Sequence, residues 1–347
     1  MTTLNQTLRS NKKVMLHYES FKNTVLLSPI EDGADSLKII SGYASPAMVD
    51  WHLTAISEDE RIQRQIDISL ILGMARQDGI GSDTHREYVR LTNQGANGNS
   101  KFECSYVHRS SPVHAKLYIW ERDGAPFRAF VGSANYSQVA FSPARREILC
   151  DCDPAEALAY YAYILGDTVF CNHSEIEEFV TIRSEREMYK RLQAEEGLSA
   201  QDVKDNQVTL SLLKNDGEIP DRSGINWGQR DGREHNQAYI SLPAEIARRG
   251  FFPLDKQHFS VLTDDGHQLI LRVEQQNDKA ITTPHNNSLI GEYLRNRLGV
   301  RNGGFVTKQD LTRYGRTNIT FEKIDDEHFY MDFSVNGATA QGTTPVA

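Results

Sequence analysis

The chain has 347 residues, of which 39% are hydrophobic and 24% charged, and its formal net charge is -9 at pH 7. This length exceeds the usual size of a single hydrophobic core, so we expect two domains. Nowhere do eighteen apolar residues run together, and residues 1–20 contain no apolar segment of signal-peptide length. These features argue against a membrane-spanning or secreted protein and favour a cytoplasmic one.

The cysteines are too few for a disulfide scaffold; they are Cys104, Cys150, Cys152 and Cys171. They also lack the paired C-x-x-C spacing of zinc sites. We therefore expect buried thiols, and neither a disulfide framework nor a structural metal.

From about residue 36 the sequence alternates strand-like and helix-like segments, which is typical of an α/β layer structure. Ser45 is expected to cap a helix that has Pro46 at its first position, and Asp153 to cap another. Asp123-Gly124 is a hairpin signal between two strands. The predicted strands are 36–45, 65–75, 102–110, 113–123 and 127–137, and the predicted helices are 46–56, 82–94 and 154–165.

The second half of the chain has many short strands with tight turns, which indicates a barrel or a sandwich. Strands are predicted at 206–213 and 237–243, hairpins at 258–275 and 318–335, and short helices at 244–250 and 288–299. The charged segment 174–200 is predicted to be helical. The expected division is a first domain at 1–178, a helical connector at 179–205, a second domain at 206–335 and a disordered tail at 336–347.

A polar motif accompanies the first-domain hairpin. His114 and Lys116 stand two residues apart in a predicted strand, so their side chains would project from the same face. The next strand leads into Gly132-Ser133-Ala134-Asn135, and Glu147 follows. Imidazole can act as a nucleophile or an acid near neutral pH, while lysine and amide groups can donate to phosphoryl oxygens. These residue types suit phosphodiester cleavage; the alternative is a hairpin with solvated polar side chains.

The order H-A-K, then G-S-A-N, then Glu147 resembles the nuclease branch of the phospholipase D superfamily. The resemblance implies that His114 attacks phosphorus to form a phosphohistidine and that cleavage requires no metal cofactor. It also implies the remaining catalytic roles: Lys116 and Asn135 bind the phosphate, Ser133 supports it, and Glu147 orients the imidazole.

The chain departs from the superfamily pattern in two ways. Glu121 stands where the longer motif has an aspartate, and we leave it out of the catalytic set. The other ten histidines include no second H-x-K, although the chemistry uses two histidines. Single-motif members of the superfamily dimerise to build one site. We therefore expect a homodimer in which His114 of each copy faces the other across a two-fold axis.

Two segments of the second half are rich in residues that can contact DNA. Arginine matches guanine, and asparagine or glutamine matches adenine. Between residues 295 and 323 seven basic residues stand against two acidic ones, although the net charge of the whole chain argues mildly against nucleic acid. As an alternative, Trp227 only attaches its loop to the barrel and the arginines are solvated. The expected DNA-binding residues are Asn226, Trp227, Gln229, Arg230 and Arg233 in one segment, and Arg313, Tyr314, Arg316 and Asn318 in the other.

This half resembles the B3-like DNA-binding domains of some restriction endonucleases, and the whole order is similar to the NgoFVII-type restriction endonuclease family. The resemblance implies an α/β phospholipase-D-like nuclease domain followed by a mostly-β B3-like pseudobarrel domain. It further implies a type II-like, site-specific deoxyribonuclease of a restriction-modification system, a hydrolase that cleaves double-stranded DNA in a composite dimer active site. Some members work beside a helicase-type ATPase, so a separate subunit of that kind is a partner that the resemblance suggests.

Two alternatives stay open at this point. A phospholipase-D-type phosphodiesterase acting on lipids or other non-DNA substrates would need an apolar entry surface or a membrane-binding helix, and the sequence offers neither. A non-catalytic DNA-binding regulator would have no use for the intact set of His114, Lys116, Asn135 and Glu147.

Overall fold

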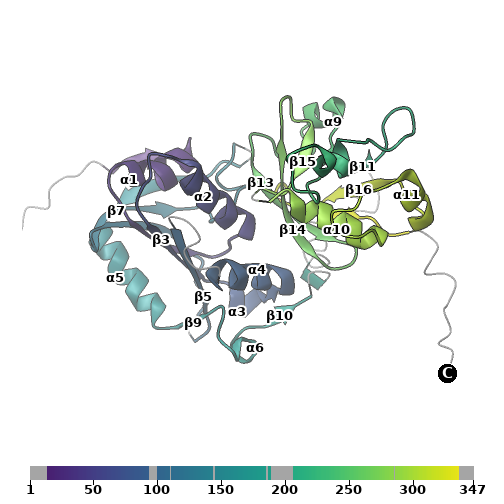
Figure 1. Cartoon of the computed structure of the whole chain (residues 1–347). Coiled ribbons are helices and arrows are strands. Elements are labelled where there is room, and N and C mark those ends of the chain that lie inside the picture. The colour runs from purple at the N-terminus through teal and green to yellow at the C-terminus, as the bar shows by residue number, and fades with distance from the viewer. Residues whose placement is uncertain are drawn as a thin grey trace, which may run out of the picture.

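The computed structural model describes residues 14–93, 100–109, 111–143, 145–184, 187–188, 206–284 and 286–335. Within these residues the chain forms two domains with separate hydrophobic cores, the first drawn from residues 21–180 and the second from residues 208–333 (Figure 1). Among the described helices, none has the length and apolarity needed to cross a bilayer. The predicted tail at 336–347 lies outside the described residues.

The first domain is built on a mixed sheet in which the described strands follow the order β1-β8-β7-β6-β2-β3-β5-β9. The pairs β2–β3 and β3–β5 are parallel, and the remaining neighbours are antiparallel. A separate parallel pair joins β4 (Ile80–Gly81) to β10 (Ile182–Arg183). The strands of the large sheet are β1 (Leu16–His17), β2 (Ser36–Ser41), β3 (Ile66–Leu72), β5 (Ser100–Val107), β6 (Lys116–Arg122), β7 (Ala125–Gly132), β8 (Leu149–Cys152) and β9 (Thr168–Phe170).

Helices cover both faces of this sheet because its side chains alternate between two apolar layers. On β6, Leu117 and Ile119 pack with Tyr161 of α5, whereas Tyr118 and Trp120 belong to the core on the other face. Figure 1 shows α5 on one side and α2 and α4 on the side toward the second domain. The helices of this domain are η1 (Lys22–Leu27), α1 (Ser28–Glu31), α2 (Pro46–Glu58), α3 (Ala75–Asp78), α4 (Ser82–Asn93), α5 (Pro154–Leu165) and α6 (Ile176–Phe179).

The local signals of the first domain are confirmed. Ser45 caps α2 by accepting a 3.2 Å hydrogen bond from the backbone of Met48, and Asp153 caps α5 in the same way. Asp123 and Gly124 form the two-residue turn of the β6–β7 hairpin, both with positive φ, as such turns require.

The predicted helix at 174–200 is wrong for its first part. Within residues 174–184 the chain forms the short helix α6 and then becomes extended in β10, while the described residues 187–188 are helical. Ile176 and Val180 are buried in the first core, so apolar contacts hold this segment against the domain. Residues 189–205 of the predicted connector lie outside the described part of the chain.

The thiol prediction holds for Cys104 and Cys171, which are buried. It is wrong for Cys150 and Cys152, which are half-buried: they lie on β8, whose outer neighbour in the sheet is the two-residue edge strand β1. None of the four forms a disulfide in the described structure.

The second domain is mostly strands, arranged in one nearly barrel-shaped sheet of order β11-β16-β17-β13-β14-β15-β12 within the described residues. Both expected hairpins, β13–β14 and β16–β17, are present. The strand β15 and the helix α11 were not predicted. The elements are β11 (Gln207–Ser211), η2 (Gly224–Gln229), β12 (Ile240–Ser241), α9 (Ala244–Arg248), β13 (His258–Thr263), β14 (Gln268–Glu274), β15 (Ala280–Thr282), α10 (Ser288–Leu298), α11 (Lys308–Tyr314), β16 (Asn318–Lys323) and β17 (His328–Asp332).

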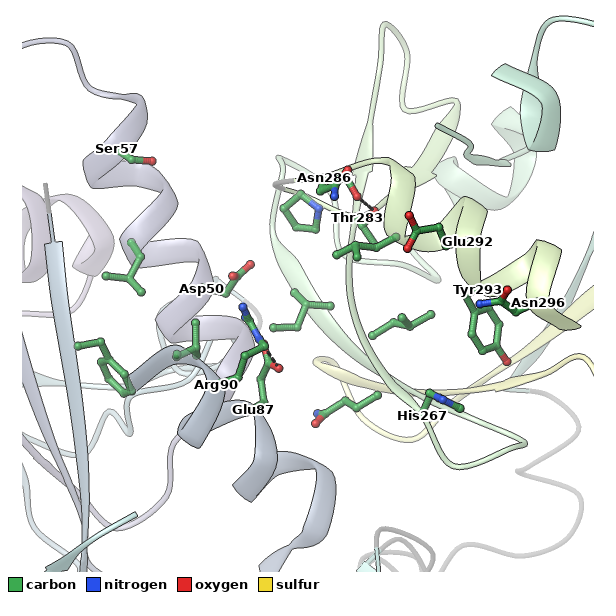
Figure 2. A pocket seen from close by; sticks show the side chains of 18 of the residues that line it. Asp50, Ser57, Glu87, Arg90, His267, Thr283, Asn286, Glu292, Tyr293 and Asn296 are labelled. Atoms are coloured by element: carbon green, nitrogen blue, oxygen red, sulfur yellow. Dashed lines mark hydrogen bonds and ion pairs between the residues drawn. The ribbon is translucent and has the colours of Figure 1, made fainter. Parts of the chain in front are cut away.

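The two domains contact each other through α2 and β13, where the buried pair His258 Nδ1 and Asp50 Oδ2 lies 3.0 Å apart. Beside this contact the domains enclose a cleft of about 980 Å³. Its walls come from α2 and α4 on one side, with Asp50 and Arg90, and from β14 and α10 on the other, with Tyr293 (Figure 2). The predicted catalytic residues do not line this cleft.

Candidate active site

The candidate active site lies at one end of the large sheet, where four adjacent strands begin or end. Strand register aligns three residue pairs across this end: Ser41 with Lys116, Leu117 with Val131, and Gly132 with Leu149. These pairs bring together the end of β2, the start of β6, the end of β7 and the start of β8. The chain segments at these strand ends carry the other predicted catalytic residues, His114, Ser133, Asn135 and Glu147.

The structure places His114 and Lys116 differently from the prediction that both project from one strand. Because β6 begins at Lys116, His114 lies in the segment before the strand and its side chain is exposed. Lys116 is only 5% exposed, and its Nζ donates a 2.7 Å hydrogen bond to the main-chain carbonyl of His114. Burial lowers the pKa of Lys116, and the negative charge of Glu147 opposes that shift. A buried cation thus lies next to the backbone of an exposed imidazole.

Two glycines at the ends of β2 and β3 leave room for the segment that carries His114. A Cβ atom on Gly42 would lie 2.8 Å from Cδ2 of His114, and one on Gly73 would lie 1.8 Å from the carbonyl oxygen of Val113. The backbone of Val113 also donates a 3.1 Å hydrogen bond to the carbonyl of Gly73. Side chains at either glycine would displace the histidine, so both positions require the close approach that glycine permits.

Asn135 is oriented by the segment that follows β2. Its Oδ1 accepts hydrogen bonds from the hydroxyl of Ser41 and from the backbone N–H of Tyr43, each 3.3 Å long. Because the amide oxygen is bonded in this way, the amide NH₂ group is the part of Asn135 left to donate to a phosphate. The ring of Tyr43 meets the imidazole of His114 edge-on, and its hydroxyl donates a 2.7 Å hydrogen bond to Asp78.

Sequence reasoning missed Ser41 and Tyr43. The signal that would have found them is their position: both stand at the end of a buried strand of the same sheet that carries the catalytic motif. Side chains from neighbouring strand ends meet at one edge of a sheet, as they do in many α/β sites.

Ser133 and Glu147 form a connected pair on the β7 and β8 side of the site. The Ser133 hydroxyl donates to the carboxylate of Glu147 and accepts a 3.0 Å hydrogen bond from the backbone of Ile148. Gly132 permits this approach, since a Cβ atom there would lie 2.0 Å from the carbonyl oxygen of Ile148. Glu147 therefore contacts Ser133, and it acts electrostatically on Lys116.

Glu121, which was left out of the catalytic set, and His108, a histidine close to the motif in sequence, both have other partners. Glu121 sits near the opposite end of β6, where it forms an ion pair with Lys38 across to β2. His108 packs edge-on against the ring of Phe179, with 4.8 Å between centroids. Among the described residues, no three histidine, cysteine, aspartate or glutamate side chains gather closely enough to hold a metal ion.

In the second domain, Asn226 supports the first predicted DNA-binding segment from inside. Asn226 is fully buried, and its Nδ2 donates to the carbonyls of Pro220 (3.1 Å) and Val306 (2.8 Å). Its Oδ1 accepts a 2.9 Å hydrogen bond from the backbone of Val306. These bonds tie the loop around η2 to the chain just before α11.

The exposed part of the first segment is arginine-rich. Arg233 stacks its guanidinium on the ring of Trp227, 3.8 Å from the ring centroid, and donates to the side chain of Gln237. Arg230 donates to the main-chain carbonyl of Arg222, and both arginines are exposed. Gln229 donates to the carbonyls of His235 and Gly303, each 3.2 Å away. Arg230 and Arg233 therefore present their charge to solvent, while Trp227 and Gln229 hold the loop.

The second predicted segment forms the end of helix α11 and the start of β16, and not a loop. Arg316 donates to Asp332, Ser334, Thr320 and Asn318, and the Tyr314 hydroxyl donates a 2.6 Å hydrogen bond to the carbonyl of Phe333. Arg313 is exposed but paired with Asp310. These side chains mainly stabilise the domain.

The basic residues between 295 and 323 do not form a continuous cationic surface. Arg295 is fully buried and bonds the main-chain carbonyls of Gly304, Asn236, Gly291 and Ile225. Arg297 is paired with Asp264 at 2.7 Å. The excess of basic residues in this part of the sequence therefore reflects internal ion pairs and loop anchors as well as exposed charge.

Comparison with protein families matches residues 19–178 to the NgoFVII restriction endonuclease N-terminal PLD domain and residues 200–325 to the NgoFVII C-terminal B3-like DNA-binding domain. Among solved structures, NucT from Helicobacter pylori is 18% identical over 46% of this chain and 98% of that chain, with a TM-score of 0.32. Nuc, a phospholipase D family member from Salmonella typhimurium, is 15% identical over 45% and 96%, with a TM-score of 0.31. Polyphosphate kinase from Porphyromonas gingivalis is 12% identical over 54% and 28%, with a TM-score of 0.30. No curated protein sequence matches the chain.

The two family matches follow each other in the predicted order, and the first includes every predicted catalytic residue. They confirm the predicted fold class, a phospholipase-D-like nuclease domain followed by a B3-like domain. The protein is accordingly a nuclease that acts on DNA phosphodiesters and carries its own DNA-binding domain. The chain belongs to the NgoFVII restriction endonuclease family.

Proposed function

We propose that this protein is a type II-like restriction endonuclease that cleaves double-stranded DNA at a specific sequence through a metal-independent phosphohistidine mechanism. The observation that carries the proposal is the grouping of His114, Lys116 and Asn135 at one end of the sheet. An exposed imidazole lies beside a buried ammonium and an amide donor, and this set matches the needs of phosphoryl transfer.

In the proposed mechanism a ring nitrogen of His114 attacks the phosphorus atom. Lys116 and Asn135 donate hydrogen bonds to the non-bridging oxygens as their negative charge grows. One ester bond to phosphorus breaks, and the leaving oxygen takes a proton from a second histidine. Water then attacks the phosphohistidine and gives a proton to the second histidine, which lost one in the first step. The bond between phosphorus and His114 breaks, so the phosphate end is released and both imidazoles return to their starting states. These steps use only side-chain donors and acceptors, so cleavage would require no metal.

The second histidine would come from another copy of the chain. Other histidines are engaged away from the site: His52 in the first core with Tyr136, and His258 with Asp50. A surface for a second copy is available beside the site, because Leu16 of edge strand β1 and Ile148 before β8 are both exposed apolar side chains. A homodimer would place two copies of His114 in one composite active site.

Sequence recognition would fall to the second domain, with Arg230 and Arg233 as the first residues to test. Both are exposed on the same loop, and stacking on Trp227 preorganises Arg233 for contact with a guanine edge or a phosphate. The other residues proposed from sequence, Gln229, Arg313, Tyr314, Arg316, Asn318 and Asn226, would act mainly by shaping this surface.

The wider setting is also a proposal. Membership of this family supports a role in a restriction-modification system in the cytoplasm. Since the sequence has no ATPase motif of its own, any dependence on ATP would come from a separate helicase-type subunit.

The decisive experiment is plasmid cleavage in EDTA by the wild type, His114→Ala and a matched His173→Ala control, whose imidazole packs against Phe179 away from the site. We expect cutting at fixed positions by the wild type and the control, and a loss of at least about a thousand-fold in His114→Ala. A strict requirement for Mg²⁺, or undiminished cutting by His114→Ala, would overturn the mechanism. DNA binding without cleavage by the wild type would indicate a regulator, and cleavage of lipid phosphodiesters alone would indicate a different substrate class.

A further inference from the structure

The second domain places a buried carboxylate against the first domain. Glu327 stands just before β17 and is 2% exposed. Its main chain is fixed within its own domain, because the backbone of Ser260 on β13 donates a 2.9 Å hydrogen bond to its carbonyl and its own N–H donates a 2.7 Å bond to Asp325. Its side chain therefore extends from a rigid part of the second domain.

Both carboxylate oxygens of Glu327 bond groups of the first domain. Oε1 accepts from the hydroxyl of Ser45, the cap of α2, and Oε2 accepts a 3.2 Å hydrogen bond from the backbone N–H of Val139. A carboxylate at this place is also favoured by the partial positive charge of the α2 N-terminus. Burial raises the pKa of Glu327, while the hydrogen bond from Ser45 works against that shift.

The two segments that Glu327 joins are those that carry the active site. Residues 41–45 run from the end of β2 to the cap of α2, and residues 133–139 follow β7. The segments are bridged in parallel at Ala44 and Tyr136, and the backbone of Ser45 donates a 3.2 Å hydrogen bond to the carbonyl of Tyr136. Between the same two segments, the backbone N–H of Tyr43 donates to Oδ1 of Asn135 and so orients this amide. Glu327 thus bonds both paired segments, 41–45 and 133–139, at Ser45 and Val139. The same pair of segments carries Asn135, the proposed phosphate donor.

We infer that Glu327 is a positioning residue for the nuclease site: the DNA-binding domain supplies the carboxylate that fixes segments 41–45 and 133–139, and through them Asn135 and His114. The inference rests on the proposed catalytic role of His114. It gives the second domain a part in the chemistry that is separate from reading DNA, because Glu327 bonds Ser45 and Val139 of the first domain and the proposed DNA contacts are made by other residues, the exposed arginines of the η2 loop.

The docking pair His258 and Asp50 offers a matched control. It joins the same two domains through the same helix α2: His258 is on β13, two residues before the Ser260 that bonds the backbone of Glu327, and Asp50 lies five residues after Ser45. Its 3.0 Å contact joins β13 to α2, whereas Glu327 bonds Ser45 and Val139 in the two active-site segments. A purely structural role of the interface would therefore make both contacts equally important, whereas a positioning role makes Glu327 the more important one for turnover.

The test uses the full-length protein and bis(4-nitrophenyl) phosphate, a small diester that needs no sequence recognition. We expect Glu327→Ala to lower kcat by about ten-fold or more with KM nearly unchanged, because a misplaced donor acts mainly on the transition state. Glu327→Gln should recover most of kcat, since the amide can accept from Val139 and donate to Ser45. His258→Gln should stay within about three-fold of the wild type.

Ser45→Gly provides a second route if Glu327→Ala fails to fold. It removes the hydroxyl that bonds Glu327 and also the cap bond to Met48, but glycine is itself tolerated as a helix cap, so α2 should still form. The kcat of Ser45→Gly should also fall. Wild-type kcat in both Glu327→Ala and Ser45→Gly, or equal losses in Glu327→Ala and His258→Gln, would overturn the inference. Failure of the proposed function is a different result: the wild type would then hydrolyse the diester no faster than His114→Ala.

Discussion

The ring of Tyr43 meets the imidazole of His114 at an interplanar angle of 77°, with 5.8 Å between the ring centroids. The backbone N–H of the same tyrosine donates to Asn135. A residue at the end of β2 therefore touches both the proposed nucleophile and a proposed phosphate donor. The hydroxyl bond from Tyr43 to Asp78 fixes the ring from its far end.

Replacing Tyr43 with alanine removes the ring that limits the motion of His114 but keeps the backbone N–H that bonds Asn135. We expect kcat for bis(4-nitrophenyl) phosphate to fall by about ten- to a hundred-fold, because small errors in nucleophile position are costly in catalysis. Tyr43→Phe keeps the ring and loses only the bond to Asp78, so its kcat should fall much less. Equal kcat in the wild type and Tyr43→Ala would show that the ring does not position the imidazole.

Asn226→Ala tests the structural role of the buried asparagine. The substitution leaves the N–H and carbonyl of Val306 and the carbonyl of Pro220 without their side-chain partner. Since each unsatisfied buried group costs about 1–3 kcal/mol, the free energy of unfolding should fall by about 2–4 kcal/mol in urea denaturation. A variant as stable as the wild type but unable to bind DNA would instead show that this amide contacts a base.

Arg230→Ala and Arg233→Ala should weaken DNA binding and leave stability nearly unchanged, in contrast to Asn226→Ala. Both side chains are exposed, so the free energy of unfolding should change by less than about 0.5 kcal/mol. The affinity for the cognate duplex should fall by about five- to a hundred-fold in a fluorescence anisotropy titration at fixed salt. Lys101→Ala, which removes an exposed charge from β5 of the first domain, should bind like the wild type. If both arginine variants bind the duplex as tightly as Lys101→Ala and the wild type do, the arginine loop does not contact DNA.

Much of the fold could be predicted because local signals agree with the global arrangement. Ser45 and Asp153 cap the helices that were expected, and Asp123-Gly124 makes the expected turn. The proposed catalytic motif could also be found from the sequence, since H-x-K and G-S-x-N are short patterns and each lies at a strand end.

The remaining parts depend on contacts between residues distant in the sequence. Arg316 and Asn226 are polar residues in glycine-containing segments, which resembles a DNA-binding segment. Tertiary packing instead uses both as anchors: Asn226 is fully buried, and Arg316 is partly buried and paired with Asp332. The contact of Glu327 with Ser45 spans 282 positions and leaves no local pattern. Burial of polar side chains is the property that the sequence alone could not provide here.

A composite dimer site predicts a specific result when active and inactive chains are mixed. If each site needs His114 from both copies, mixed dimers of wild type with His114→Ala are inactive. Equal amounts of the two chains, refolded or co-expressed together, should then show about a quarter of the activity of the same total amount of wild type. Independent sites would show about half. A monomeric mass in light scattering at the assay concentration would contradict the dimer directly.

His52 couples the stability of the first domain to pH. Its Nε2 lies 3.3 Å from the carbonyl of Leu26, which can only accept, so Nδ1 is left to accept from the hydroxyl of Tyr136 at 2.9 Å. Burial lowers the pKa of His52 from 6.5 to about 4, although the bond to Leu26 opposes the shift. The folded protein therefore keeps this ring neutral at pH values where the unfolded chain binds a proton.

Below pH 6.5 the unfolded state gains that proton and the folded state does not, so the stability linked to His52 is complete above pH 6.5 and is lost as the pH falls toward about 4. The loss should approach about 3 kcal/mol across this interval. Urea denaturation followed between pH 7 and pH 5 should show a steeper decline in the free energy of unfolding for the wild type than for His52→Gln, which cannot titrate. Parallel declines in the two proteins would mean that His52 is already accessible to protons in the folded state.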